Sequence, residues 1–468
     1  MKASRGFLAL ALVCSLFVLS SRGAEQRRQY NVLFITVDDL RPELGAYGNP
    51  IIKTPNIDKL ASWGVRFDAA YAQVPLCSPS RASMLTGRYP TQTGVLDNGT
   101  WSVVTLPKYF KQQGYVTLRT GKIFHAGPGW GKEDTEAWSV GANDYGWNSE
   151  TDAATPTVRA APPTVRAAPP SAEQYARHSD RIVALEGNGE THMDYRAATR
   201  AIELLEEYKD KPFFLAVGLL QPHSPPTAPK KMIEMYDAAK MPLPVDFAPR
   251  PQAPAGFPAR SIEPNNDLFI GRDASEQEAR NMIRGYYASI TFTDANIGRV
   301  LDALERLKLR ERTIIVFWGD HGYHLGEKGK WSKHNSLFEV ATRIPLLIVL
   351  PGAKGNGQGS PRVVEAVDLY PTLTDLCGLP LPAGLMGQSL GPLLDNPKAK
   401  WKQPAYMVTK HGKAVRTERW RYAEWEDGSA MLFDHTRDPH ELKNLANDPA
   451  HAEIVAKMKR LLRKLLNK

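Results

Sequence analysis

The segment N-V-L-F-I-T-V-D-D, residues 31–39, decides the fold class of this 468-residue chain. Its apolar run has almost no polar alternation, as expected of a strand buried on both faces of a sheet. Two adjacent carboxylates, Asp38 and Asp39, follow at its carboxyl end. Comparable runs recur at residues 115–118, 212–218, 313–318 and 344–350. Together these runs predict a sheet whose strands are largely parallel.

Helical patterns separate the apolar runs. Thr54 and Pro55 indicate a capped helix start, residues 195–208 carry one apolar face, and Ser275 with Glu278 forms a capping box. Alternating strand and helix signals predict an α/β fold, with a large mixed, mostly parallel sheet sandwiched by helices, over residues 24–395. Ligands of such sheets bind beyond the carboxyl ends of the strands.

The pattern changes after residue 395. Short strand signals at hairpin spacing occupy residues 405–408, 413–416, 421–425 and 431–434, and an amphipathic helix follows at 451–466. Residues 396–468 are therefore predicted to form a smaller C-terminal α+β subdomain with a small antiparallel sheet and a terminal helix. The basic face of that helix is expected to be solvated, and we expect no nucleic-acid partner.

The N-terminus predicts export. Lys2 and Arg5 precede an apolar run at 7–19, and small residues follow, which is typical of a signal peptide over residues 1–23. An uncleaved membrane anchor is the alternative. The mature protein is expected to be periplasmic, secreted or lysosomal, depending on the organism. No other apolar run approaches the ~20 residues of a membrane span.

Composition excludes several classes of protein. With 42% hydrophobic and 23% charged residues, the chain is neither disordered nor collagenous nor a coiled coil. Removing residues 1–23 takes away three positive charges and reduces the net charge from +9 to +6. That balance suits a polyanionic substrate without identifying one.

Two strand-end clusters suggest a metal site. Asp38 and Asp39 repel each other unless a cation lies between them, and carboxylate oxygens suit Ca²⁺ or Mg²⁺. Asp320 and His321 follow the run at 313–318 in the same manner. The alternatives are a turn with solvated acids for the first cluster and a helix cap for the second.

Cys77 stands out among only three cysteines. It lies in P-L-C-S-P-S-R-A-S-M-L-T-G, residues 75–87, where Pro79 favours a helix start, so Cys77 is placed near a helix N-terminus. Arg81 adds a positive charge one turn on, which favours a reactive thiolate. The alternative is a buried small hydrophobe. Cys14 would leave with the signal peptide, and Cys377 is predicted to be a core residue of a helix.

Residues 75–87 resemble the Cys-x-Pro-x-Arg signature, ending in Thr-Gly, of the formylglycine-dependent (type I) sulfatases of the alkaline phosphatase superfamily. The likeness extends from Asn31 to about Ala446 and includes residues 114–125 and 438–446. Asp320-His321 and residues 121–125 and 213–218 are similar to the iduronate-2-sulfatase-like branch. Thr120 and Gln221 depart from the pattern, and the tandem repeat at 156–169 matches nothing in that branch.

The resemblance implies a full active site. One Ca²⁺ is held by Asp38, Asp39, Asp320 and His321, together with formylglycine, which a dedicated maturation enzyme makes from Cys77. Hydrated formylglycine attacks sulfur with one hydroxyl, giving a covalent sulfo-enzyme, and its second hydroxyl expels sulfate. The implied roles are diol binding for Arg81, contact with diol and sulfate for Lys122, deprotonation of the second hydroxyl for His125, proton donation to the leaving oxygen for His223, and sulfate binding for Lys333.

We therefore expect an exported sulfatase that acts on sulfated saccharides. One alternative is a phosphate or phosphonate ester hydrolase of the same superfamily, which the Cys77–Arg81 signature disfavours. Another is a non-catalytic glycan-binding homologue. Two of these residues also have a non-catalytic interpretation: His223 would be an ordinary loop histidine, and Lys333 would be a surface lysine beside Lys328 and Lys330.

The Pro-rich residues 241–265 are predicted to form a loop that borders the substrate cleft. The sequence does not identify the sugar.

Overall fold

The computed structural model describes residues 29–96, 103–125, 134–140 and 179–466. The expected signal peptide at 1–23 and the repeat at 156–169 lie outside the described residues. Among the described residues, no helix combines the length and the apolar character needed to cross a membrane.

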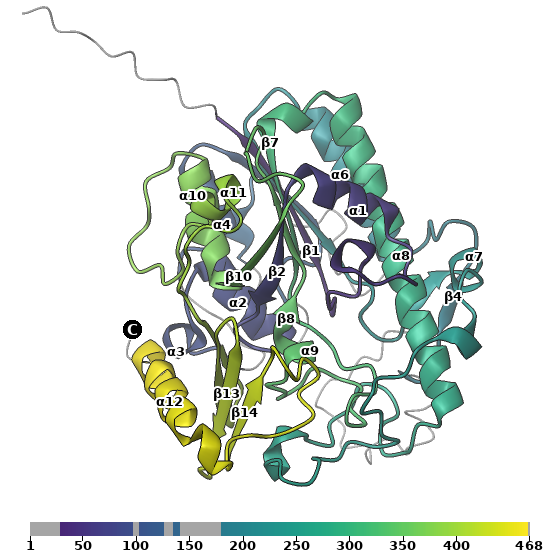
Figure 1. The fold of residues 1–468 in the computed structure, drawn as a ribbon. Helices are drawn as coiled ribbons and strands as arrows, with labels where there is room; N and C mark the ends of the chain where they lie inside the picture. Colours follow the sequence, from purple (N-terminus) through teal and green to yellow (C-terminus); the bar gives the residue numbers. More distant parts are fainter. Residues whose placement is uncertain (1–28, 97–102, 126–133, 141–178, 467–468) are drawn as a thin grey trace, which may run out of the picture.

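A mixed sheet forms the centre of the larger part of the fold (Figure 1). Its order is β10-β2-β9-β7-β1-β5-β3, with β8 beside β2. The pairs of β1 with β5 and β7, of β3 with β5 and of β10 with β2 are parallel, whereas β9 is antiparallel to its neighbours. The strands are β1 (Asn31–Val37), β2 (Val65–Tyr71), β3 (Val116–Gly121), β5 (Phe213–Leu219), β7 (Thr313–Gly319), β8 (Arg343–Ile344), β9 (Leu346–Val349) and β10 (Gly359–Glu365). The predicted mixed, mostly parallel sheet is confirmed.

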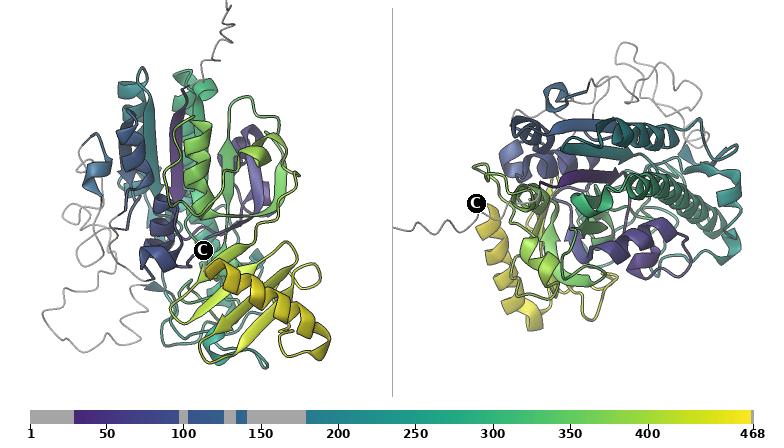
Figure 2. Two further views of the ribbon diagram at one scale, coloured as in Figure 1. Left: turned by 90° about the vertical axis from the view of Figure 1, so that its left-hand side faces the viewer. Right: turned by 90° about the horizontal axis from the view of Figure 1, so that it is seen from above.

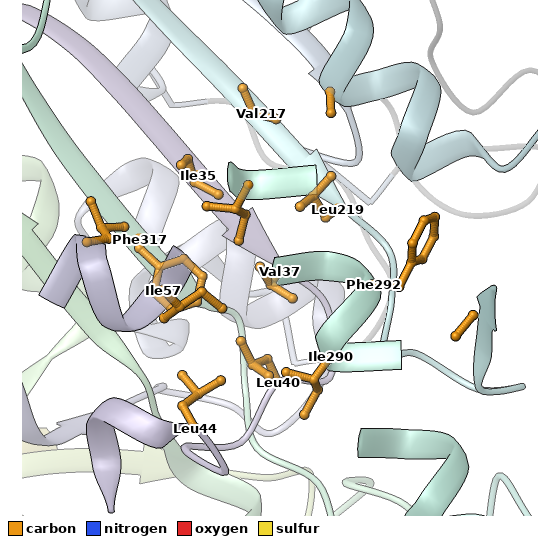
Figure 3. Close-up of a cluster of buried hydrophobic side chains, with 14 of the residues drawn as sticks. Ile35, Val37, Leu40, Leu44, Ile57, Val217, Leu219, Ile290, Phe292 and Phe317 are labelled. Carbon is orange, nitrogen blue, oxygen red and sulfur yellow. The ribbon is translucent and has the colours of Figure 1, made fainter. Parts of the chain in front are cut away.

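Alternate side chains of the same strands fill two separate cores. Ile35 and Val37 of β1 lie on one face with Phe317 of β7, under α1, α6 and α8 (Figure 3). Val32 and Phe34 of β1 lie on the opposite face, which α2, α4, α10 and α11 cover. Figure 2 shows these helix layers on both sides of the sheet. Burial on both faces explains why the runs lack polar alternation.

The helices of these layers are α1 (Pro55–Trp63), α2 (Cys77–Thr86), α4 (Leu106–Gln112), α6 (Met193–Tyr208), α8 (Glu276–Arg306), α10 (Leu369–Leu376) and α11 (Gly391–Asp395). Short helices α3 (Pro90–Thr93), α7 (Lys230–Ile233) and α9 (Glu339–Thr342) and a two-stranded sheet of β4 (Val183–Leu185) and β6 (Thr227–Pro229) connect them. Ser275 and Glu278 make the predicted capping box. Thr54 precedes α1 but bonds to Gly45 and Asp58 instead of capping the helix backbone.

Two details of the predicted strands were wrong. The run at 344–350 is split at Pro345, which cannot donate a backbone hydrogen bond, into β8 and β9. Strand β9 is antiparallel to both of its neighbours, which agrees with a mixed sheet. Strands β2 and β10 were missed altogether. Charged residues such as Arg66, Asp68 and Arg362, at partly exposed positions, interrupt their apolar character.

The C-terminal part is a small antiparallel sheet with one helix, as predicted. It runs in the order β11-β12-β13-β14, whose bounds are Ala405–Val408, Gly412–Arg416, Trp420–Trp425 and Ala430–Asp434. Helix α12 (Ala452–Leu466) lies along this sheet and buries Met458 and Leu462 against it (Figures 1 and 2). Lys457 and Lys464 are exposed, which agrees with a solvated basic face.

Arg421 of β13 ties the small sheet to the large one. Its fully buried guanidinium lies 2.6 Å from Glu339 Oε2 and 2.9 Å from Glu441 Oε1, and Nη1 donates to the Leu337 carbonyl at 2.7 Å. Glu339 also accepts from the Tyr71 hydroxyl of β2. The junction between the two sheets is therefore a buried ion-pair network that fixes the chain around residue 338.

Replacing Arg421 with Met is expected to lower the free energy of unfolding by about 3 kcal/mol, because two carboxylates lose a buried partner. Arg250→Met is the control, since Arg250 and its partner Asp273 are 67% and 49% exposed, and it should cost less than about 1 kcal/mol. Urea unfolding followed by circular dichroism measures both. Equal stabilities of the two variants would contradict a structural role for Arg421.

Candidate active site

The two acid clusters predicted from the sequence lie side by side. Strands β1 and β7 are parallel neighbours, with Val37 opposite Gly319, so Asp38 and Asp39 leave the sheet at the same edge as Asp320 and His321. All four side chains are fully buried. The structure thus places the predicted metal ligands beyond the carboxyl ends of two central strands, where open α/β sheets bind ligands.

The backbone of Asp39 turns sharply to bring its carboxylate into this cluster. Asp39 adopts φ +58°, a left-handed conformation that is uncommon for residues other than glycine. Its amide donates to Asp320 Oδ1 at 3.1 Å, and the Tyr286 hydroxyl of α8 donates to its carbonyl at 2.7 Å. Tyr286 was not predicted, because nothing in a long helix rich in buried residues marks one tyrosine as facing the site.

Cys77 is the first residue of α2 and faces the acid clusters. Its Sγ lies 3.3 Å from Asp38 Oδ1 and 3.3 Å from His321 Nε2, and it is also hydrogen-bonded to His125. Burial raises the pKa of the thiol, but Lys122 and Lys333 outweigh burial and hold that pKa well below its ordinary value. The buried thiol is thus in an electropositive site rather than among apolar side chains.

Three buried cations surround the carboxylates. Arg81 Nε donates to Asp320 Oδ2 at 2.9 Å, and its Nη1 donates to the carbonyls of Lys122 and Ile123. Lys122 bonds Asp38, and Lys333 Nζ lies 2.9 Å from Asp39 Oδ1. Burial lowers the pKa of both lysines, but the neighbouring anions raise it above the ordinary value, so both stay charged.

The pKa values of the two predicted histidines are shifted in opposite directions. Burial and the charge of Lys122 lower the pKa of His125, which favours a neutral imidazole. Burial also lowers the pKa of His223, but Asp39, whose Oδ2 is 3.9 Å from His223 Nε2, raises it to about 9. His223 Nδ1 is 2.9 Å from the Ser224 carbonyl, so Nε2 points toward the site. A histidine suited to accept a proton and one suited to donate a proton thus lie at the same site.

The donor set suits a hard divalent cation. Ligand atoms of Asp38, Cys77, Asp320 and His321 all lie within 4.8 Å of one another, and Asp39 shares the cluster through Cys77 and His223. Burial, and after it the charge of the adjacent Asp38, raise the pKa of Asp320 above its ordinary value, so a shared cation would favour its ionised form. Carboxylate oxygens are the ligands that Ca²⁺ prefers. The residues present therefore fit the predicted calcium ion.

Other residues near the site divide into structural and functional ones. The Tyr323 hydroxyl donates to the Trp331 carbonyl, and buried His324 bonds Ser336, so neither is free to meet a substrate. Residues 241–265 are joined to the loop of Lys333 through Lys328–Asp246 and Lys330–Glu263 contacts. Asp267, just beyond that segment, lies 3.5 Å from Lys333 Nζ. Its role in the site was missed, because no local pattern distinguishes it.

Known proteins match this chain over most of its length. The family model "Sulfatase" matches residues 30–379, and "N-sulphoglucosamine sulphohydrolase, C-terminal" matches residues 326–468. Iduronate 2-sulfatase of Homo sapiens is 35% identical over 430 residues, covering 81% of this chain and 76% of its own. The alignment covers 76% of that relative, so the similarity is not confined to a short shared fragment.

Solved structures share the fold. A phosphonate monoester hydrolase of Agrobacterium radiobacter gives a TM-score of 0.76 at 24% identity, covering 93% of this chain and 95% of that one. A protein solved in complex with its substrate D-glucosamine-2-N,6-O-disulfate gives 0.72 at 22% identity, covering 94% and 98%. The sheet and the helices on both of its faces are thus a fold that these hydrolases share. The chain belongs to the sulfatase family, whose model matches most of it, and it is therefore a sulfuric ester hydrolase.

Proposed function

We propose that this protein hydrolyses sulfate esters of saccharides, with Ca²⁺ bound by Asp38, Asp39, Asp320 and His321 and with Cys77 converted to formylglycine. The observation that carries the proposal is the position of Cys77. Its Sγ is within 3.3 Å of Asp38 and His321, and Lys122, Lys333 and Arg81 lie around it. A nucleophile at that point has the buried cations Lys122, Lys333 and Arg81 near it to stabilise a sulfuryl group.

The ion and the modified residue supply chemistry that the encoded side chains lack. When bound, Ca²⁺ would supply positive charge next to the sulfate oxygens and the reacting hydroxyl, and the hydrate of formylglycine would offer one hydroxyl for attack and a second for release of sulfate. Lys122 and Lys333 bind the sulfate oxygens and stabilise the negative charge that spreads over them in the transition state. Arg81 holds Asp320 and the chain at Lys122, which fixes the ligand and the lysine together.

One of the two histidines acts as a general acid and the other as a general base. The Nδ1 atom of His223 contacts the Ser224 carbonyl, so Nε2 lies toward Asp39 and donates a proton to the departing sugar oxygen. His125, which is hydrogen-bonded to Cys77, accepts the proton of the hydroxyl that remains. The assignment rests on where the side chains lie, and the raised pKa of His223 and the lowered pKa of His125 agree with it.

The likeness to iduronate 2-sulfatase and to a protein bound to a sulfated glucosamine supports a sulfated sugar as substrate. Gln221, two residues before His223, is buried and accepts a hydrogen bond from the Thr227 amide, so it supports the loop rather than contacting the sugar as a charged residue would. We propose export through the N-terminal segment, and a formylglycine-generating enzyme as the maturation partner.

Phosphate ester hydrolysis is the second candidate, because phosphonate monoester hydrolases share the fold. We expect the protein, co-expressed with a formylglycine-generating enzyme, to hydrolyse an aryl sulfate with a kcat/KM about tenfold or more above that of the matching aryl phosphate, a barrier difference of at least about 1.4 kcal/mol. A panel of 2-, 4- and 6-sulfated disaccharides then identifies the sugar and position. Preference for the phosphate would contradict the proposal.

A further inference from the structure

Asp267 is a carboxylate at the site with no role in the chemistry described so far. Its Oδ2 lies 3.5 Å from Lys333 Nζ and its Oδ1 lies 3.5 Å from His334 Nε2. Its side chain is 21% exposed, whereas Asp39, on the opposite side of Lys333, is fully buried. Asp267 thus occupies the outer edge of the site, between two basic side chains of one loop.

A negative charge at that position needs an explanation. The substrate is an anion, and a carboxylate near it repels it unless a cation intervenes. Burial raises the pKa of Asp267, but Lys333 and His334 lower it below the ordinary value, so the group is ionised. The negative charge of Asp267 by itself weakens sulfate binding. The neighbouring Lys333 compensates for it.

Lys333 lies between two carboxylates. Its Nζ is 2.9 Å from Asp39 Oδ1, 3.0 Å from Asp39 Oδ2 and 3.5 Å from Asp267 Oδ2. A flexible lysine with Asp39 as its sole anionic partner would be drawn wholly onto a carboxylate that also serves as a metal ligand. The second, partly exposed carboxylate gives the ammonium another anionic partner, which weakens its attachment to Asp39.

The segment that carries Asp267 is firmly held. The Asp267 amide donates to the Trp331 carbonyl at 2.8 Å, and the Trp331 amide donates to Asn266 Oδ1 at 2.9 Å. Lys330 Nζ donates to the Glu263 carbonyl at 3.0 Å and to Asn265 Oδ1 at 2.6 Å. These bonds hold the backbone that carries Asp267 against the loop that carries Lys333, so the closeness of the two side chains is a property of the folded site.

We propose that Asp267 is a positioning residue that keeps the Lys333 ammonium from being drawn wholly onto Asp39, so that Lys333 stays available to the sulfate. The proposal rests on the proposed function, because it assigns Lys333 to sulfate binding. Asp267 touches neither the metal ligands nor Cys77 in any described contact. Its charge also acts on His223, but its ion pair is with Lys333 rather than with His223, and Lys333 is the group through which we expect it to act.

The test is a double-mutant cycle with an aryl sulfate on the protein matured with a formylglycine-generating enzyme. We expect Asp267→Asn to lower kcat about 10- to 100-fold, the range for a misplaced catalytic group, with little change in KM, because the amide cannot hold the ammonium electrostatically but also removes a repulsive charge. Asp267→Glu should recover part of the loss. Asp273→Asn, which alters a surface carboxylate paired with Arg250, should match the wild type.

The second arm of the cycle separates positioning from a general effect on the fold. In a Lys333→Ala background, adding Asp267→Asn should change kcat less than twofold, because a residue that acts through Lys333 has nothing left to position. A wild-type kcat in Asp267→Asn, or an equal loss with and without Lys333, would overturn the inference while the sulfatase function stands. A wild-type protein inactive on aryl sulfates would remove the proposed function, and this inference with it.

Discussion

Cys77→Ala is expected to lower kcat for sulfate ester hydrolysis by about 10⁴- to 10⁶-fold, the range for removal of an activated nucleophile. The alanine leaves Lys122, Lys333 and His125 in place, so sulfate binding persists while attack on sulfur stops. Cys377→Ala is the matched control. Cys377 is also buried, but it packs in the core on one face of the sheet at the end of α10 and should be dispensable for activity.

Mass spectrometry of the peptide that contains Cys77 completes this prediction. The active protein should show conversion of the thiol to the aldehyde, and the fraction converted should scale with kcat across preparations that contain different amounts of the maturation enzyme. Full activity with only unmodified thiol at position 77 would contradict the formylglycine mechanism. Substantial activity in Cys77→Ala would contradict any mechanism in which this residue attacks sulfur.

The strand-end acids were predictable because two local signals coincide. A strand buried on both faces is a run of apolar residues, and a carboxylate directly after it leaves the sheet at the carboxyl edge. Asp38 and Asp320 both follow such runs, and β1 and β7 are adjacent in the sheet. Cys77 was placed at a helix start by Pro79 alone, and α2 does begin at Cys77. Local pattern thus located the centre of the site.

The supports of the site were not predictable in this way. Tyr286 and Asp267 act through partners distant in sequence, the Asp39 carbonyl and Lys333 Nζ, and such pairings exist only after the chain has folded. Strands β2 and β10 were not predicted because their position in the sheet also depends on the folded structure. They lie toward one edge of the sheet, where partly exposed positions accept charged residues such as Arg66 and Arg362, so the apolar signal is diluted.

Removal of divalent cations is expected to lower kcat by about 100-fold or more, which is the consequence of losing a few kcal/mol of charge stabilisation. Restoring Ca²⁺ should return the activity. It should also stabilise the fold, by about 2.7 kcal/mol when free Ca²⁺ is 100 times its Kd, because three buried carboxylates that repel one another gain a shared cation. Thermal unfolding followed by fluorescence reads this effect without any turnover.

Asp38→Asn distinguishes the predicted site from adventitious binding. Asp38 is fully buried, and its carboxylate lies against Lys122, Arg81 and Cys77, so its amide variant loses one of the three acids that the cation needs. Its melting temperature should therefore respond little to Ca²⁺, whereas that of Asp273→Asn should rise as in the wild type. Intact activity after exhaustive chelation, or equal stabilisation of Asp38→Asn and the wild type by Ca²⁺, would contradict the metal site. The charges of the three buried carboxylates would then be neutralised by Arg81, Lys122 and Lys333 alone.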